Sequence, residues 1–336
     1  RDVAPSRGLG DVYKRQHHDN GKFLYDTGLL EQVDKLLKQE GIETLELGGV
    51  LPNPRLSLVR EGISLAKEEQ VDLVLAIGGG SVIDSAKAIG LGVVTDTDVW
   101  EFFTGNAVPE KSLPTGVILT CPATGSESSA VTVVNHTDVG MKLLVSNPVV
   151  CPAIAFMNPE LTYSLPKFLT ACGVVDMFSH VCERYFTPDS EIGVIDRMSE
   201  GILKTLVEIG PKVLEEPSNY SYRAEIMWIG TIAHNNTVGI GRVQDWATHE
   251  IGNELSALYD TPHGVANAII LPVVMEYNAP YTGEKYREIA RAMGVEGVDA
   301  MTQEEYRKAA CDAVRKLGQD VGIPADLKAC LLYTSP

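Results

Sequence analysis

The sequence predicts an α/β domain with a parallel sheet, followed by an all-helical domain. Apolar runs and helical patterns alternate up to about residue 157, and this alternation implies parallel βαβ units. From Pro159 onward, apolar residues recur at helical spacing. A length of 336 residues suggests two domains or one large one, so we place a domain boundary between residues 157 and 158.

The elements of both domains follow from these patterns in chain order. The run VDLVLAI at 71–77 is apolar throughout, which is typical of a strand buried on both faces. In the first domain we expect helices over 23–40, 56–68 and 81–91, strands over 42–47, 71–77 and 116–120, and a β-hairpin over 131–145 with its turn near 137–140. In the second domain we expect helices over 173–185, 191–213, 222–235, 245–258, 265–278, 286–293 and 303–321.

The two ends of the chain do not resemble the rest. Ser6–Gln16 reads SRGLGDVYKRQ, and 330–336 reads CLLYTSP. One back-translation of DVYKRQ has a reverse complement that encodes CLLYT after a shift of one base. We therefore expect residues 1–16 and 330–336 to be the translation of one sequencing adapter, and we exclude them from fold reasoning. The first strand of the sheet and the last helices would then be missing.

Composition narrows the class of protein. The formal net charge is −17, which argues against binding to nucleic acid or to an anionic membrane. No apolar stretch approaches 18 residues and no signal peptide is evident, so we expect a cytoplasmic protein. The six cysteines show no C-x-x-C spacing and are interpreted as reduced core residues.

A glycine-rich turn, IGGGSVIDSAK, joins a buried strand to a helix. Bare glycines let backbone N–H groups approach a phosphate, and the helix N-terminus adds partial positive charge. Ile83 stands where a third fingerprint glycine would be, so the G-x-G-x-x-G motif is absent. The alternative is structural, with Ser81 as the helix N-cap and Asp84 completing a capping-box-like pair. The polar loop TCPATGSES at 120–128 follows another buried strand and favours the phosphate-binding interpretation.

Four residues could hold a metal ion. Asp176 and His180 are four apart on a probable helix with apolar surroundings, so their side chains share one buried face. His249 has a similar setting, and His263 follows Pro262 at the probable first turn of a helix. One carboxylate and three imidazoles suit Fe²⁺ or Zn²⁺. The alternative for the first pair is a local hydrogen bond. His234 could face the site or be exposed.

Five motifs now resemble one known family. GGGSVIDSAKAIG, PATGSESS, NPELTYSLP, GVVDMFSHVCERY and HEIGNELSALYDTPHG are similar, in this order, to the motifs of iron-containing (group III) alcohol dehydrogenases, with the NAD(P)H-dependent butanol-dehydrogenase-like branch nearest. The resemblance covers about residues 17 to 329. It implies the dehydroquinate synthase-like fold, with an N-terminal dinucleotide-binding domain and a C-terminal metal-binding domain, and we expect a homodimer.

The resemblance also implies roles for individual residues. The metal, Fe²⁺ or Zn²⁺, would be held by Asp176, His180, His249 and His263. The implied cofactor contacts are Gly79, Gly80 and Ser81 at the pyrophosphate, Asp84 near the nicotinamide, Thr120 and Thr124 near the cofactor, and Lys142 near a ribose.

This chain departs from the family at several positions. Many relatives have a histidine four residues after the third ligand, near the nicotinamide, but here that catalytic position is Asn253, which does not titrate. HHDNGKF at 17–23 stands where many relatives have a second glycine-rich loop. The second strand ends at Gly48 rather than at an acidic residue, so no carboxylate repels a 2′-phosphate and NADP(H) is favoured over NAD(H). The alternative is that glycine merely makes the turn.

The sequence thus predicts a metal-dependent alcohol dehydrogenase or aldehyde reductase that transfers a hydride between NAD(P)H and a small primary alcohol or aldehyde. The alternatives are a lyase or polyol dehydrogenase on the same scaffold, and an inactive cofactor-binding fragment. A dehydroquinate-synthase-like lyase would need a basic pocket for an anionic substrate. Phe178, Trp246 and Leu258 instead favour small apolar alcohols.

Overall fold

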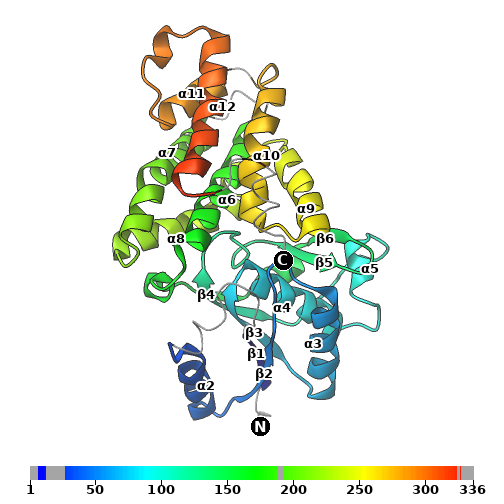
Figure 1. The fold of residues 1–336 in the computed structure, drawn as a ribbon. Coiled ribbons are helices and arrows are strands. Elements are labelled where there is room, and N and C mark those ends of the chain that lie inside the picture. The colour runs from blue at the N-terminus through cyan, green and yellow to red at the C-terminus, as the bar shows by residue number, and fades with distance from the viewer. Residues whose placement is uncertain (1–6, 13–26, 188–192, 283, 324–325, 327–336) are drawn as a thin grey trace. The chain divides into compact units, whose positions relative to one another are not determined.

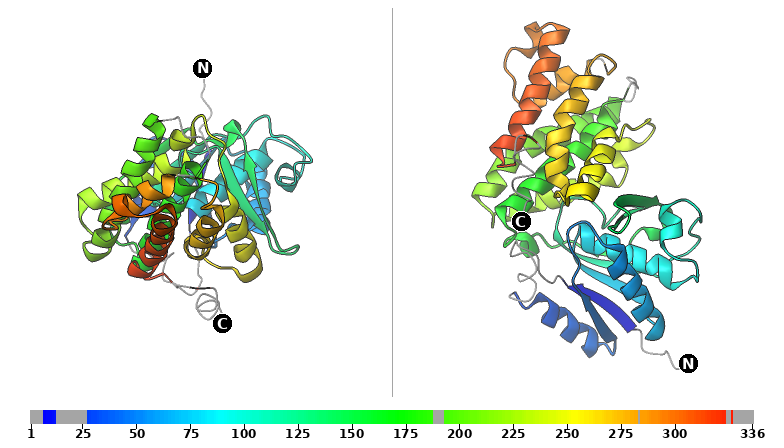
Figure 2. Two further views of the ribbon diagram at one scale, coloured as in Figure 1. Left: turned by 90° about the horizontal axis from the view of Figure 1, so that it is seen from above. Right: turned by 45° about the vertical axis from the view of Figure 1, so that its right-hand side comes forward.

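The computed structural model describes residues 7–12, 27–187, 193–282, 284–323 and 326 (Figures 1 and 2). They fall into two compact units, one within Arg1–Cys121 and Gly125–Ser164, the other within Pro122–Thr124 and Leu165–Pro336. The units therefore divide after Ser164, whereas the sequence predicts a boundary after residue 157. The 3-10 turn η2 (Pro159–Thr162) accounts for the difference, because it contacts strand β4 (Thr115–Cys121) of the first unit.

The first unit is built on a five-stranded parallel sheet. Its strand order is β2-β1-β3-β4-β7, and every neighbouring pair is parallel. The strands are β1 (Arg7–Val12), β2 (Glu43–Gly48), β3 (Leu73–Gly79), β4 (Thr115–Cys121) and β7 (Ile154–Phe156). The predicted parallel sheet and its three predicted strands are confirmed, with bounds shifted by one or two residues. β7 has three residues, too few for a recognisable pattern.

β1 fills the place in the sheet where the sequence predicts a missing strand. Arg7–Val12 pairs in parallel with both β2 and β3. With the first strand missing, we expect its neighbours either to stay unpaired or to take a substitute from residues 1–16, and Arg7–Val12 is that substitute. The physical reason is that β2 and β3 each present a row of backbone N–H and C=O groups, with which an extended segment of almost any sequence can pair. The adapter origin of residues 1–16 and 330–336 stays a prediction.

Helices and one hairpin complete the first unit. The helices are α2 (Leu29–Gln39), α3 (Leu56–Glu68), α4 (Gly80–Val93) and the short α5 (Trp100–Phe103). Helix α4 contacts β3, α3 and β5, and it is buried from Val82 to Gly92. The predicted hairpin is confirmed as β5 (Val131–His136) and β6 (Met141–Ser146), which form a separate antiparallel sheet. The part of the predicted first helix before residue 27, and the HHDNGKF stretch, lie outside the described residues.

The second unit is helical, as predicted. Its helices are α6 (Lys167–Tyr185), α7 (Gly193–Glu215), α8 (Tyr220–His234), α9 (Ala247–Tyr259), α10 (His263–Asn278), α11 (Lys285–Ala292) and α12 (Gln303–Asp320). Helix α6 contacts α7, α8 and α10 and is buried without interruption from Gly173 to Tyr185. A helix buried on all sides has no solvent-facing stripe for its polar residues. Its ionisable side chains are therefore enclosed, and each needs a partner.

Short 3-10 turns connect these elements at η1 (Pro148–Val150), η3 (Thr237–Gly239) and η4 (Val298–Ala300). The five described cysteines are free thiols. In the part of the chain that the structure describes, every helix is too short or too polar to cross a membrane.

Candidate functional site

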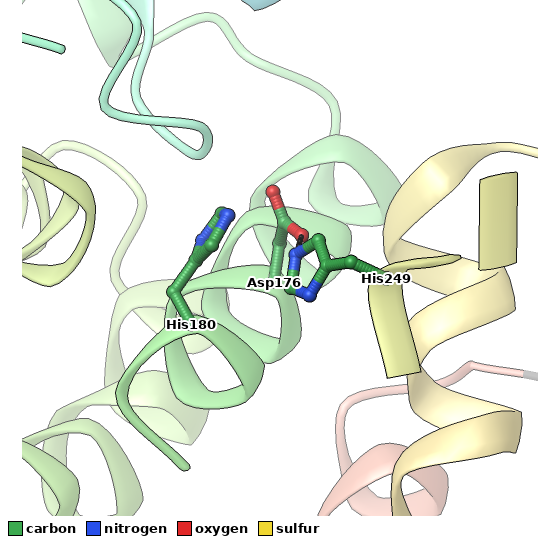
Figure 3. Close-up of side chains that lie close together, drawn as sticks. All are labelled: Asp176, His180 and His249. Atoms are coloured by element: carbon green, nitrogen blue, oxygen red, sulfur yellow. Dashed lines mark ion pairs between the residues drawn. The ribbon is translucent and has the colours of Figure 1, made fainter. Parts of the chain in front are cut away.

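Four side chains predicted as ligands meet inside the helical unit. Asp176 and His180 come from α6 and His249 from α9, and one oxygen or nitrogen of each lies within 4.8 Å of the others (Figure 3). His263 is the first residue of α10. Its Nε2 lies 3.6 Å from Asp176 Oδ1, the same separation that Oδ1 has from His249 Nε2. Asp176 thus faces imidazoles from two other helices. A local hydrogen bond between Asp176 and His180, the alternative interpretation, does not account for these contacts.

A close approach between α10 and α6 makes this cluster. A Cβ atom at Gly264 would lie 2.5 Å from the carbonyl oxygen of Cys172, so only glycine allows the first turn of α10 to lie against α6. Pro262 precedes the helix as its N-cap residue and fixes the backbone just before His263. Pro262 and Gly264, on either side of His263, therefore allow the His263 side chain to lie beside Asp176.

Burial and neighbouring charge set the protonation of the cluster. Burial alone would raise the pKa of Asp176, but His180, His263 and His249 outweigh it and hold that pKa well below the ordinary value. Burial lowers the pKa of His180 well below its ordinary value. Burial also lowers the pKa of His249, but Glu183 and Asp176 raise it by more, to about 9. The Asp176 carboxylate is thus ionised and His180 is neutral, which are the forms that bind a metal. His249 is protonated on both ring nitrogens at neutral pH, so a bound cation would displace one of its two ring protons.

Two polar residues that the sequence does not single out touch the cluster. Asn267 donates its side-chain Nδ2–H to Asp176 Oδ1 at 2.9 Å, and Nδ2 lies 3.1 Å from His249 Nε2 and 3.3 Å from His263 Nε2. Glu183 bonds His249 Nδ1. A spacing signal exists for both, because Asn267 is four residues after His263 and Glu183 is three after His180.

His234 is a further histidine that lies against the cluster, which answers whether it faces the site or is exposed. Its ring is half-buried and stacks on the ring of His180, with centroids 4.4 Å apart. Its Nδ1 bonds the carbonyl oxygen of Thr124, so Thr124 contributes its backbone here. Burial, with Arg184 second, lowers the pKa of His234 to about 3. His234 is therefore neutral, with Nδ1 as the donor to Thr124.

The apolar residues expected to line the substrate site are only partly there. Trp246 meets the rings of His249 and His180 edge-on, at 5.2 and 6.1 Å. Phe178 is buried in the apolar core, and Leu258 is 65% exposed. The expectation is wrong for these two because helix geometry turns them away: Phe178 is two residues after Asp176, about 200° round the helix, and Leu258 is nine after His249, about 180° round. Asn253, four after His249, is buried on the same side of α9 as that ligand.

The glycine-rich turn has the predicted strand–turn–helix form. Gly79 ends β3 and caps α4, Gly80 is the first helical residue, and Ser81 lies one residue further in. The alternative in which Ser81 caps the helix is therefore wrong, since Gly79 holds the cap position without a side-chain bond. A Cβ at Gly79 would lie 2.8 Å from Cys121 Cβ on the neighbouring strand, so glycine is also required there for packing.

Asp84 is buried one turn inside α4. Its carboxylate accepts hydrogen bonds from Ser126 Oγ at 2.6 Å and from the backbone N–H of Val133 at 3.3 Å. Burial raises its pKa, and the charges of Lys87 and Lys142 oppose that rise. The carboxylate thus ties α4 to the loop after β4 and to the β5 strand, and its place near a nicotinamide stays a prediction.

Two of the other residues predicted to contact the cofactor lie at or near the carboxyl ends of parallel strands. Thr120 is buried near the end of β4, and Gly48 is the last residue of β2. Parallel strands end at one edge of a sheet, where ligands of open α/β sheets bind. Lys142 lies on β6 of the hairpin and donates to the Asn53 side-chain oxygen at 3.0 Å.

Comparison with known proteins resolves the family. Residues 19–159 match the profile described as iron-containing alcohol dehydrogenase, and residues 170–330 match that of the C-terminal part of the Fe-containing alcohol dehydrogenase family. The chain belongs to the iron-containing alcohol dehydrogenase family. The resemblance inferred from the five motifs is confirmed, and so is the predicted fold.

Individual members of the iron-containing alcohol dehydrogenase family match most of the chain. The probable NADH-dependent butanol dehydrogenase 2 of Bacillus subtilis (strain 168) is 38% identical over 300 residues, which are 89% of this chain and 77% of that protein. The NADPH-dependent aldehyde reductase YqhD of Escherichia coli (strain K12) is 38% identical over 304 residues, 90% of this chain and 78% of that protein. The crystal structure of an NADH-dependent butanol dehydrogenase A from Thermotoga maritima superposes with a TM-score of 0.90 at 36% identity, covering 96% of this chain and 79% of that one.

Proposed function

We propose that this protein is a metal-dependent alcohol dehydrogenase or aldehyde reductase that transfers a hydride between NAD(P)H and a small primary alcohol or aldehyde. The observation that carries the proposal is the convergence of the buried Asp176, His180 and His249 with the half-buried His263 in a member of this family. Two relatives at 38% identity, a probable butanol dehydrogenase and an aldehyde reductase, support the same reaction class.

The donor set supports Fe²⁺ or Zn²⁺ as the metal. One carboxylate oxygen and three imidazole nitrogens are ligands that both ions accept. Among the described residues, the buried Nδ1 of His180 has no hydrogen-bond partner, so the ring fits coordination better than a closed hydrogen-bond network. A divalent cation held by these four residues would supply a Lewis acid that polarises the substrate oxygen.

The other residues would bind and orient the reactants. Asn253 follows His249 by one turn, and its amide can bond a substrate oxygen without titrating. The backbone at Gly79, Gly80 and Ser81 would receive the cofactor pyrophosphate at the N-terminus of α4. We place Thr120, Thr124 and Lys142 along the cofactor, with Asp84 nearest the nicotinamide. Trp246 supports a small, apolar substrate, because it is the aromatic side chain that borders the cluster.

We also propose that NADP(H) is preferred over NAD(H). The support is that Gly48 ends β2 without a carboxylate. The turn itself depends on the next residue, because Gly49 has a φ of +97° that side-chain-bearing residues rarely adopt. The two relatives at 38% identity use NADH and NADPH respectively, so either preference fits the family.

Replacing Gly48 with aspartate is expected to shift the preference toward NADH. A carboxylate there would repel the 2′-phosphate of NADPH and could accept a hydrogen bond from the free 2′-hydroxyl of NADH. The measurement is the ratio of kcat/KM for the two cofactors, which should change by about tenfold or more in favour of NADH, and a tenfold change corresponds to about 1.4 kcal/mol. Gln39→Glu, at an exposed position of the same unit, adds the same negative charge and serves as the control. An unchanged ratio would show that the 2′ position is recognised elsewhere.

The proposed function is tested directly by aldehyde-dependent oxidation of NADPH. Protein stripped with a chelator should oxidise NADPH with butanal only after Fe²⁺ or Zn²⁺ is restored. A lyase on this scaffold would give no aldehyde-dependent oxidation, and a cofactor-binding fragment would bind NADPH without turnover. The expected homodimer and cytoplasmic location remain proposals, which sedimentation velocity and cell fractionation test.

A further inference from the structure

Glu183 is a buried carboxylate that neither the sequence patterns nor the proposed function accounts for. It lies on α6, three residues after His180, and its exposed fraction is 4%. A buried carboxylate is costly unless its oxygens are hydrogen-bonded. Both oxygens of Glu183 have partners, and all of these partners belong to the start of helix α9, where His249 lies.

One oxygen of Glu183 caps the N-terminus of α9. Oε1 accepts the backbone N–H of Thr248 at 2.7 Å and that of His249 at 3.2 Å, which are the second and third residues of the helix. These N–H groups have no partner within a helix, and a negative charge is stabilised near them. The backbone carbonyl of Glu183 also accepts the N–H of Asp245 at 3.1 Å. Glu183 therefore fixes the segment that leads into α9 to α6 through both its side chain and its backbone.

The other oxygen sets the orientation of the His249 ring. Oε2 bonds Nδ1 of His249, and a carboxylate can only accept at this contact, so Nδ1 must be the donor. The opposite nitrogen, Nε2, then faces Asp176 Oδ1 at 3.6 Å. Asn267 Nδ2 lies on the same side, 3.1 Å from Nε2. Glu183 thus holds the ring on one edge while the cluster occupies the other.

We propose that Glu183 is a positioning residue that holds His249 with Nε2 directed at the metal. The proposal rests on the proposed function, because it assumes that His249 is a ligand. A ligating histidine usually donates its second ring N–H to such a partner, which fixes the ring and makes the bound nitrogen more basic. Glu183 adds a second contribution, since the same carboxylate fixes the backbone of His249 as well as its side chain.

The test compares Glu183→Gln with Glu250→Gln in the full chain. Glutamine keeps the shape of Glu183 but replaces one acceptor oxygen with an NH₂ donor. In one amide orientation the NH₂ group faces the backbone N–H groups of α9, and in the other it faces the N–H of His249 Nδ1, so one hydrogen bond is lost either way. Glu250 is exposed on the same helix, and its replacement makes the same change in net charge. The measured quantity is the dissociation constant for Zn²⁺, obtained by competition with a chromophoric chelator. We expect Glu183→Gln to raise it about 10–100-fold, as for other partners of ligating histidines, and Glu250→Gln to leave it unchanged.

Other readouts separate a positioning role from its alternatives. Cobalt(II) bound to Glu183→Gln should keep the wild-type absorption bands, because the ligands are the same, and shifted bands would mean that Glu183 is itself a ligand. Urea unfolding of the metal-free variants measures what Glu183 contributes to the free energy of unfolding when no metal is bound. In the wild type, ¹⁵N NMR should show His249 protonated at Nδ1 when Zn²⁺ is bound, and the opposite tautomer would overturn the proposal even if the glutamine variant does not fold.

The outcomes distinguish this inference from the proposed function. If the wild type binds Zn²⁺ and Glu183→Gln binds it equally well, only the role of Glu183 is wrong. If the wild type binds no Zn²⁺, Fe²⁺ or Co²⁺, the metal site and the proposed function fail together, and Glu183 has nothing to position.

Discussion

Replacing His263 with alanine is expected to abolish metal-dependent turnover while leaving NADPH binding nearly unchanged. His263 Nε2 faces Asp176 Oδ1 at 3.6 Å. Among the described contacts of α10, the other side chain that reaches this carboxylate is Asn267, one turn further along the helix. With the proposed ligand set, the substitution would remove one of four donors and with it one metal bond. The affinity for Zn²⁺ should therefore fall by more than about 100-fold, the upper range for residues that only orient a ligand.

The measurement pairs metal occupancy with cofactor affinity. Zn²⁺ content after gel filtration and aldehyde-dependent NADPH oxidation should fall together, while fluorescence titration with NADPH should give the wild-type dissociation constant. Tyr277→Ala is a suitable control, since this side chain is on the same helix and is 77% exposed. A variant that keeps its metal and loses NADPH instead would contradict the assignment of His263 as a ligand.

The cluster of proposed metal ligands could be predicted because its members violate the apolar pattern of buried helices. An acid and an imidazole four residues apart in an apolar stretch share one face, and that face must meet something polar. The pattern is local, so it is visible in sequence. The spacing of Glu183 from His180 places both on one side of α6, but it does not identify the partner of Glu183, because that contact joins residues 66 apart in the chain. Burial of Glu183 follows from α6 being enclosed on all sides, which is a property of the packed unit and not of the stretch itself.

Side-chain direction was the weaker part of the sequence interpretation. Phe178 and Leu258 are near Asp176 and His249 along the chain, yet the helix turns them to the core and to solvent. Counting residues at 100° per position excludes both from the site, whereas proximity in sequence includes them. Trp246 precedes α9 and is not subject to the same rotation, and it does border the cluster.

Backbone pairing explains why the first strand was not predicted. Strand β1 carries the sequence RGLGDV, which has neither alternation nor an apolar run. Its place is determined by the two strands beside it, both of which follow recognisable patterns. In the same way, the capping of α4 by Gly79 in place of Ser81 reflects the close packing of Gly79 on Cys121, a contact between strands that the local motif does not encode.

Replacing Lys87 with methionine is expected to lower the free energy of unfolding by about 3–5 kcal/mol, the usual cost of breaking a buried charged network by removing one partner. Lys87 is fully buried on α4. Its ammonium group donates to Ser126 Oγ at 2.9 Å, to the Ser129 carbonyl at 2.9 Å and to the Val131 carbonyl at 2.8 Å. Methionine fills similar space but donates no hydrogen bond, so two carbonyls and the Asp84–Ser126 pair would lose their cationic neighbour.

Urea unfolding of Lys87→Met and of Lys111→Met, an exposed lysine of the same unit, measures the effect; the control should change by less than about 0.5 kcal/mol. The pH dependence gives an independent check. Burial, opposed by the charge of Asp84, lowers the pKa of Lys87 from 10.5 to about 8, so between these two values the unfolded chain binds more protons than the folded one. Stability from this group therefore rises with pH across that window in the wild type and not in the variant. The difference in unfolding free energy between the two proteins should widen from pH 8 to pH 10, and a constant difference would show that Lys87 keeps an ordinary pKa in the folded protein.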